Sequence, residues 1–123
     1  MDVRVLVVDD QEPFRAAAEA VIDTTPGFVL VGAVASGEQA VEAAAALRPG
    51  LVLMDVVLPG IDGLTAAKQI LSAAPSVTVV LLSTYDLADH GSAVEASGAA
   101  AFVPKSAFGP DVLTALLPPH DGR

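Results

Sequence analysis

Cysteine is absent from this chain of 123 residues, which excludes a disulfide-stapled fold, a thiolate zinc site and a cysteine nucleophile. Aromatic residues are scarce at 4%, whereas hydrophobic residues make up 53% of the sequence. The core must therefore consist mainly of Ala, Val, Leu and Ile, a composition that suits valine-rich strands covered by alanine-rich helices. A chain of this length is expected to form one domain with a core large enough to fold without disulfide bonds or a structural metal.

Basic residues are also few: six Lys and Arg stand against fifteen Asp and Glu, for a formal net charge of −9. A surface this acidic repels phosphate backbones, so we expect no direct nucleic-acid binding by this segment. Strand-like aliphatic runs are short, as in Val79–Leu82, and fall far below the length of a membrane span. The first residues enter a strand pattern without the layout of a signal peptide. These features predict a cytoplasmic protein with no membrane contact.

Short runs rich in β-branched residues alternate along the chain with alanine-rich amphipathic segments. The runs are almost continuously apolar, as expected for parallel strands that are buried on both faces. The five predicted strands are Val3–Val8, Phe28–Val34, Leu51–Met54, Val77–Leu82 and Ala100–Val103. This alternation predicts an α/β fold, a doubly wound five-stranded parallel sheet with the flavodoxin-like order 2-1-3-4-5 and five helices. The predicted domain covers residues 1–117, and residues 118–123 are expected to be a tail or the start of a linker.

Helix boundaries are suggested by proline, glycine and capping residues. Pro13 is expected at the first position of the first helix, whose apolar stripe is Phe14, Ala17, Ala18, Val21 and Ile22. Ser36 with Gln39 forms a capping box for the second helix. The third helix carries Leu64 to Ala74, the fourth runs from about Leu87 to a left-handed Gly98, and the fifth begins near Pro110.

Polar residues follow four of the five predicted strands, and in an open α/β sheet ligands bind outside the carboxyl ends of the strands. These residues are Asp9, Asp10, Asp55, Ser83, Thr84 and Lys105. Three neighbouring carboxylates repel one another and need a counter-charge. An all-oxygen set favours a hard cation, Mg²⁺ or Mn²⁺. Together with a lysine, such a cation can neutralise phosphoryl oxygens, so the pattern suits phosphoryl transfer onto a carboxylate.

Each of these residues has an ordinary interpretation when it is taken alone. An Asp-Asp pair often forms a turn or a helix cap, and Asp55 or Ser83 could satisfy backbone groups at a strand end. Lys105 alone would be a solvated charge. Only their joint placement favours a site. No glycine-rich nucleotide loop is present, and His90 and His120 fall on a predicted helix and in the tail, so a histidine-based hydrolase is not supported.

Four segments together resemble the receiver domains of two-component response regulators over essentially the whole chain. These segments are Val5–Asp10, Met54–Leu64, Leu81–Tyr85 and Ala101–Lys105. The piece from Asp55 to Gly60 is the most specific. Ser-Thr-Tyr-Asp at 83–86 and Gly-Phe-x-x-Val-Gly at 27–32 are similar to the NarL/FixJ-type subfamily.

The resemblance implies a phosphoacceptor rather than a conventional enzyme. Asp55 would accept a phosphoryl group from a phosphohistidine of a sensor histidine kinase. Asp9 and Asp10 would hold Mg²⁺ together with Asp55 and the backbone carbonyl of Val57. Lys105 would pair with the phosphoryl group. The only reactions that the domain would then catalyse are its own Mg²⁺-dependent phosphorylation and dephosphorylation.

The resemblance also implies a set of switch residues. Ser83 would be the hydroxyl that moves toward the phosphoryl group, and Phe102 the aromatic residue that follows it. Thr84 would be the small residue that controls access to the site. Val57 and Tyr85 lie where side chains tune the rate of dephosphorylation in the family.

Some positions of the sequence match the family pattern and others depart from it. Gly63 matches a turn glycine at the start of the third helix, and Ser83 replaces the commoner threonine while keeping the hydroxyl. Many members carry a proline after the lysine in a cis bond, whereas Ser106 follows Lys105 here, so no cis bond is expected there. The isomer of the bond before Pro104 is left open.

The favoured function is a phosphorylation-controlled signalling switch, and the resemblance implies that its switch surface meets either a partner protein or a second receiver, which would form a homodimer on phosphorylation. NarL/FixJ-type regulators carry a DNA-binding domain after the receiver, and nothing resembling one follows Leu117, so we expect either a stand-alone receiver or a fragment of a transcriptional regulator cut at the linker. One alternative is a receiver-like module that binds partners without being phosphorylated. Another is a Mg²⁺-dependent phosphohydrolase with an Asp nucleophile, which usually has Asp-x-Asp after the first strand and a cap insertion, neither of which is seen here.

Overall fold

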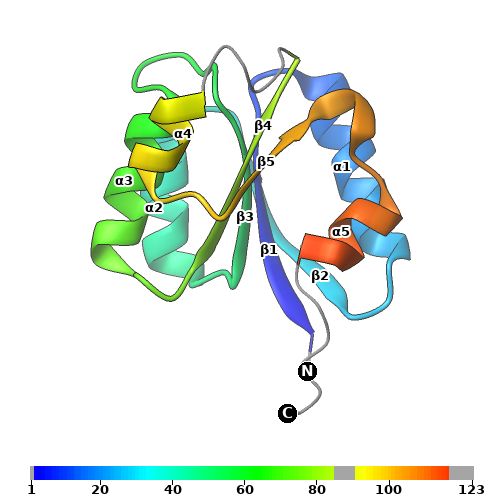
Figure 1. Ribbon diagram of the computed structural model, residues 1–123. Helices are drawn as coiled ribbons and strands as arrows, with labels where there is room; N and C mark the ends of the chain where they lie inside the picture. The colour runs from blue at the N-terminus through cyan, green and yellow to red at the C-terminus, as the bar shows by residue number, and fades with distance from the viewer. Residues whose placement is uncertain (1, 85–90, 117–123) are drawn as a thin grey trace.

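The computed structural model describes residues 2–84 and 91–116, in which five strands alternate with five α-helices (Figure 1). The strands are β1 (Val3–Val8), β2 (Phe28–Val34), β3 (Leu51–Asp55), β4 (Thr78–Ser83) and β5 (Ala101–Pro104). The helices are α1 (Glu12–Thr24), α2 (Gly37–Leu47), α3 (Gly63–Ala73), α4 (Gly91–Ser97) and α5 (Pro110–Leu116), with a 3₁₀ helix, η2 (Lys105–Ala107), before α5.

The strands form one parallel sheet in the order β2-β1-β3-β4-β5, which confirms the predicted architecture. Every predicted strand begins and ends within one residue of its observed bounds. The prediction succeeds because the central strands are buried on both faces and therefore read as continuous apolar runs. All five residues of β3, for example, are buried.

Helices cover both faces of the sheet, with α1 and α5 on one side and α2, α3 and α4 on the other (Figure 1). Successive strand side chains point to opposite faces, so β1 and β3 contribute to two separate core clusters. Val5, Val7, Leu51 and Leu53 pack beneath α1 and α5. Leu6, Val8, Val52 and Met54 pack beneath α2, α3 and α4.

The helix ends follow the predicted signals with small shifts. Ser36 Oγ accepts a hydrogen bond from the Gln39 N–H at 3.1 Å, as a capping box requires. The Gln39 side chain, however, accepts its bond from the N–H of Ala35, one residue earlier than the standard box. Pro13 is the second residue of α1, because that helix begins one residue earlier than predicted.

Other details refine or fall outside the prediction. Gly98 is left-handed as predicted, with φ +85°, and the bond before Pro104 is trans, since the described residues contain no cis peptide. Ala17, which the sequence pattern places on the apolar stripe of the first helix, is exposed. Residues 85–90 and 117–123 lie outside the described residues. The predicted start of the fourth helix, Tyr85, both histidines and the tail are therefore not described.

None of the helices in the described ranges is both long enough and apolar enough to cross a membrane.

Candidate functional site

The carboxyl ends of the parallel strands bring the predicted polar residues to one edge of the sheet. Asp9 follows β1, and Asp55 is the last residue of β3, the strand beside it. Lys105 follows β5, two strands further along, and its long side chain reaches back to both carboxylates. The register of parallel strands therefore turns three distant positions of the chain into one cluster.

Lys105 bridges the two buried carboxylates. Its Nζ lies 2.6 Å from Asp9 Oδ2 and 3.0 Å from Asp55 Oδ2, and it donates a hydrogen bond to Gln11 Oε1 at 3.1 Å. The side chains of Lys105 and Asp55 are each 8% exposed and that of Asp9 is fully buried. Charges this well buried must be paired, because desolvation would otherwise be costly.

The remaining carboxylate oxygens indicate how a cation would be held. Asp9 Oδ1 accepts the Gln11 N–H at 2.8 Å, and Asp55 Oδ1 accepts the Val57 N–H at 3.2 Å. Asp9 Oδ2 is buried and, despite its ion pair with Lys105, accepts no hydrogen bond of good geometry from the described residues. A cation bound here would share this oxygen with the Lys105 ammonium.

Asp10 completes this group. It is exposed, and one carboxylate oxygen from each of Asp9, Asp10 and Asp55 can be chosen so that all three lie within 4.8 Å of one another. Carboxylate oxygens in this arrangement suit Mg²⁺ or Mn²⁺ and are poorly suited to softer metals.

The charges of the cluster alter its acid–base behaviour. Burial raises the pKa of the Asp55 carboxyl above its usual value, although Lys105 and the Val57 N–H act in the opposite direction. Burial alone would lower the pKa of Lys105, but its interactions with Asp9 and Asp55 outweigh this effect and raise it. Lys105 is therefore a permanent cation at neutral pH.

Lys105 and Asp9 also contact aromatic and basic side chains that the sequence did not indicate as part of the site. Lys105 Nζ lies 4.8 Å from the centre of the Phe14 ring, close enough for a cation–π contact. Phe14 in turn packs against Phe108, with ring centroids 6.1 Å apart. Arg15 Nη1 donates to the Asp9 backbone oxygen at 2.8 Å. The only signal in the sequence is that Phe14 and Arg15 closely follow the Asp-Asp pair.

The predicted switch residues also lie on β4 and β5 near this edge. Ser83 is the last residue of β4 and is completely buried, whereas Thr84, immediately after it, is exposed. Phe102 is partly buried, lies beside Leu81 in the sheet and packs against the core cluster beneath α2, α3 and α4. Val57, two residues after Asp55, is 56% exposed.

Gly63 fixes the distance between β3 and α3. A Cβ at this position would collide with the backbone oxygen of Asp55 and lie 2.9 Å from the Cα of Val56. Both atoms belong to the main chain and cannot rotate away. The Gly63 N–H donates to the Val56 oxygen at 2.8 Å, so the start of α3 packs directly on the end of the strand that carries Asp55.

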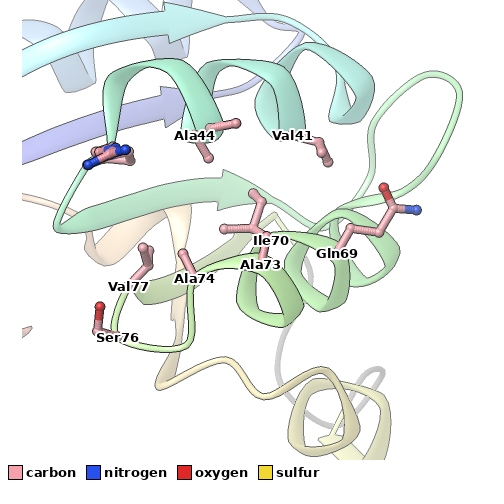
Figure 2. Close-up of a pocket in the computed structure, with 11 residues that line it drawn as sticks. Val41, Ala44, Gln69, Ile70, Ala73, Ala74, Ser76 and Val77 are labelled. Carbon is pink, nitrogen blue, oxygen red and sulfur yellow. The ribbon is translucent and has the colours of Figure 1, made fainter.

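A separate groove of about 480 Å³ lies between α2 and α3, at the opposite end of the strands (Figure 2). Its lining is mostly alanine and valine, and Arg48 is its only charged residue. The lining residues shown are Val41, Ala44, Ala45, Arg48, Pro49, Gln69, Ile70, Ala73, Ala74, Ser76 and Val77. The groove includes no residue of the acidic cluster and is not part of the candidate site.

Comparisons with known proteins agree with this arrangement. Residues 5–117 match the response regulator receiver domain family. The chain is 41% identical over 106 residues to a protein-glutamate methylesterase/protein-glutamine glutaminase of Alkalilimnicola ehrlichii, which covers 85% of this chain and 27% of that protein. It is 31% identical over 121 residues to the response regulator UvrY of Escherichia coli, covering 98% of this chain and 56% of that protein.

A solved structure gives the same result for the fold. The signal receiver domain of the putative response regulator NarL from Mycobacterium tuberculosis superposes with a TM-score of 0.89 at 30% identity, over 99% of this chain and 98% of that one. The chain thus spans between about a quarter and just over half of the two curated relatives, and nearly all of this receiver domain.

Proposed function

This chain belongs to the response regulator receiver domain family, and from that membership we propose that it is a phosphorylation-controlled switch of a two-component system. Asp55 accepts the phosphoryl group from a phosphohistidine of a sensor histidine kinase. The observation that carries the proposal is the position of Lys105 Nζ between Asp9 and Asp55, with Asp10 beside them.

The transfer needs one nucleophile and a place for the charge of the phosphoryl group. An Asp55 carboxylate oxygen attacks phosphorus in line with the bond to the donor nitrogen. An O–P bond forms as the P–N bond breaks, and the bonding electrons leave with the imidazole of the donor, which takes up a proton. Lys105 Nζ is already within 3.0 Å of Asp55 Oδ2, so it stands where the phosphoryl oxygens arrive.

The residues of the cluster fit a divalent cation. We propose that the carboxylates of Asp9, Asp10 and Asp55 and the carbonyl of Val57 hold Mg²⁺, with Mn²⁺ as a possible substitute. The support is the all-oxygen donor set, in which one oxygen from each of Asp9, Asp10 and Asp55 lies within 4.8 Å of the others. When bound, Mg²⁺ supplies positive charge against the oxygens of the transferring group.

The signal then passes from the site to the surface. Once Asp55 is phosphorylated, the Ser83 hydroxyl moves toward a phosphoryl oxygen, Phe102 fills the vacated space, and Thr84 controls access from solvent. This movement biases the surface of α4, β5 and α5 between two packings. The burial of Ser83 and the neighbouring strands β4 and β5 support this route.

The output of the switch rests on the relatives. We propose that the chain is the receiver of a cytoplasmic transcriptional regulator of the NarL/FixJ type, and that phosphorylation promotes a homodimer. The likeness to UvrY and to the NarL receiver supports this assignment. The net charge of −9 argues that any contact with DNA is made outside this segment.

A second candidate output is favoured by one observation. The identity of 41% to a protein-glutamate methylesterase/protein-glutamine glutaminase suggests a receiver that controls an attached enzyme. Sedimentation of the beryllofluoride-treated protein separates the two proposals. A phosphorylation-dependent dimer supports the transcriptional regulator, and a monomer in both states supports the receiver of an enzyme.

The phosphoryl switch is tested by intact-mass spectrometry after incubation with Mg²⁺ and acetyl phosphate. We expect one labile phosphoryl adduct on the wild type, no adduct on Asp55→Asn, and no adduct when a chelator is present. Asp62→Asn is the matched control, because Asp62 is an exposed carboxylate that caps α3.

The opposite results would point to the alternatives. A wild type that binds neither Mg²⁺ nor beryllofluoride and takes no phosphoryl group would indicate a binding module that works without phosphorylation. Continuous release of phosphate from many phosphomonoesters, with turnover, would indicate a phosphohydrolase.

A further inference from the structure

The loop of residues 56–62, between β3 and α3, is tied to the first turn of α2. The Ile61 N–H donates a hydrogen bond to Glu38 Oε2 at 3.0 Å. Glu38 is an exposed residue of α2, so its carboxylate also lies at the favourable, positive end of the helix dipole. This contact joins two parts of the chain that are 23 positions apart.

Two glycines allow the loop and the helix to approach this closely. Gly60 has φ +74°, and a Cβ there would collide with the Glu38 carboxylate. A Cβ on Gly37 would lie 2.6 Å from the backbone oxygen of Ile61. A side chain at position 37 would therefore push the loop away from α2, whereas one at position 60 would displace the Glu38 carboxylate and strain the backbone. The Glu38 carboxylate lies in the space that a side chain at position 60 would occupy.

The same loop reaches the acidic cluster at its other end. The Val57 N–H donates to Asp55 Oδ1 at 3.2 Å, and the Val56 N–H donates to the Leu82 oxygen at 2.9 Å. Between Val57 and Ile61 lies Leu58, which is buried in the core. The loop of residues 56–62 is thus fixed at both ends. Glu38 makes the contact at the end farther from the charged cluster.

We propose that Glu38 is a positioning residue: by holding Ile61, it keeps the loop in the conformation in which Val57 reaches Asp55. Its effect on loop geometry stands without the phosphoryl chemistry, whereas its effect on phosphorylation rests on the proposed function. Glu38 touches neither the carboxylates nor Lys105, so it acts only through the loop.

Solvent-exchange NMR of the metal-free protein tests the geometric part. In Glu38→Ala we expect the Ile61 amide to exchange roughly ten-fold faster and the Val57 amide roughly three-fold faster, since one hydrogen bond to a charged group is lost. Calorimetric titration with Mg²⁺ and the rate of acetyl phosphate labelling should each show a loss of about three- to ten-fold. The urea midpoint of the whole domain is measured alongside, to detect general destabilisation.

Two variants separate the contact from the charge. Glu38→Gln removes the charge but keeps an acceptor oxygen, and it should stay within about two-fold of the wild type in every measurement. Glu42→Ala removes a charge from the same helix at an exposed position whose side chain makes no hydrogen bond or ion pair within the described residues, and it should behave likewise.

Three results would overturn the proposal. If the Ile61 amide of Glu38→Ala exchanged at the wild-type rate, the hydrogen bond from Ile61 to Glu38 would not restrain the loop. If the Ile61 amide exchanged faster while the Val57 amide exchanged at the wild-type rate, the contact with Glu38 would not affect the part of the loop that reaches Asp55. Equal losses in Glu38→Ala, Glu38→Gln and Glu42→Ala would assign the effect to net charge. If the wild type takes no phosphoryl group and binds no Mg²⁺, the proposed function fails, and the two amides still decide the role of Glu38.

Discussion

The two ends of the sheet use burial in opposite ways. At the carboxyl end, Asp9, Asp55 and Lys105 are held almost free of solvent, an arrangement that is costly unless each charge has a partner. At the other end, the groove between α2 and α3 is lined mostly by alanine and valine (Figure 2). The carboxyl end should therefore respond to charge and ligands, and the groove end to side-chain volume.

The largest effect should come from removing the lysine at the carboxyl end. Lys105→Met leaves two buried carboxylates without their cation, so we expect a loss of about 3 kcal/mol in the free energy of unfolding without metal. Acetyl phosphate labelling should fall by at least about 100-fold. Urea denaturation and intact-mass kinetics measure the two effects. Lys68→Met, which changes an exposed lysine of α3, should alter neither. An unchanged labelling rate in Lys105→Met would remove Lys105 from the proposed mechanism.

The next effect compares one glycine at each end. Gly63→Ala forces a methyl group against the main chain of Asp55 and Val56, and we expect a loss of roughly 2–3 kcal/mol of stability together with weaker Mg²⁺ binding. Gly50→Ala, at the other end of β3, places its Cβ at ordinary contact distances of 3.8 and 3.9 Å and should change stability by less than about 1 kcal/mol. Both are measured by urea denaturation. Equal losses would show that the close approach at Gly63 is relieved by backbone movement.

Metal addition should sharpen the contrast further. Mg²⁺ at about 100 times its dissociation constant should stabilise the wild type by about 2.7 kcal/mol, because only the folded state assembles the three carboxylates. Asp9→Asn removes a proposed ligand and relieves carboxylate repulsion, so this variant should gain little from Mg²⁺. Thermal unfolding with and without Mg²⁺ measures the difference. A gain in Asp9→Asn equal to that of the wild type would place the metal elsewhere.

The smallest effect is expected in the groove. Ala73→Leu adds apolar volume to its lining and should stabilise the protein by about 0.5–1 kcal/mol without changing phosphorylation. Ala46→Leu, on an exposed part of α2 that does not line the groove, is the matched control and should be nearly neutral. A change in labelling rate in Ala73→Leu would show that the two ends of the sheet are coupled.

The sequence predicted the sheet well because each strand carries its own evidence. Continuous apolar runs such as Leu51–Met54 indicate burial on both faces, and the polar residues that follow four of the five runs mark the edge where ligands bind. That rule alone was enough to predict that Asp9, Asp55 and Lys105 would meet, and the structure brings them together. Their roles in phosphoryl transfer remain predictions.

Other features were decided only by the tertiary structure. The contacts of Phe14 with Lys105 and of Glu38 with Ile61 join distant parts of the chain, and no local pattern indicates them. The exposure of Ala17 likewise depends on the orientation in which α1 packs against the sheet. The sequence by itself determined the elements, their order and the edge that carries the charges, because periodicity and strand ends are local properties. Which side chains touch across that edge depends on how all the helices pack, and that is a property of the whole fold.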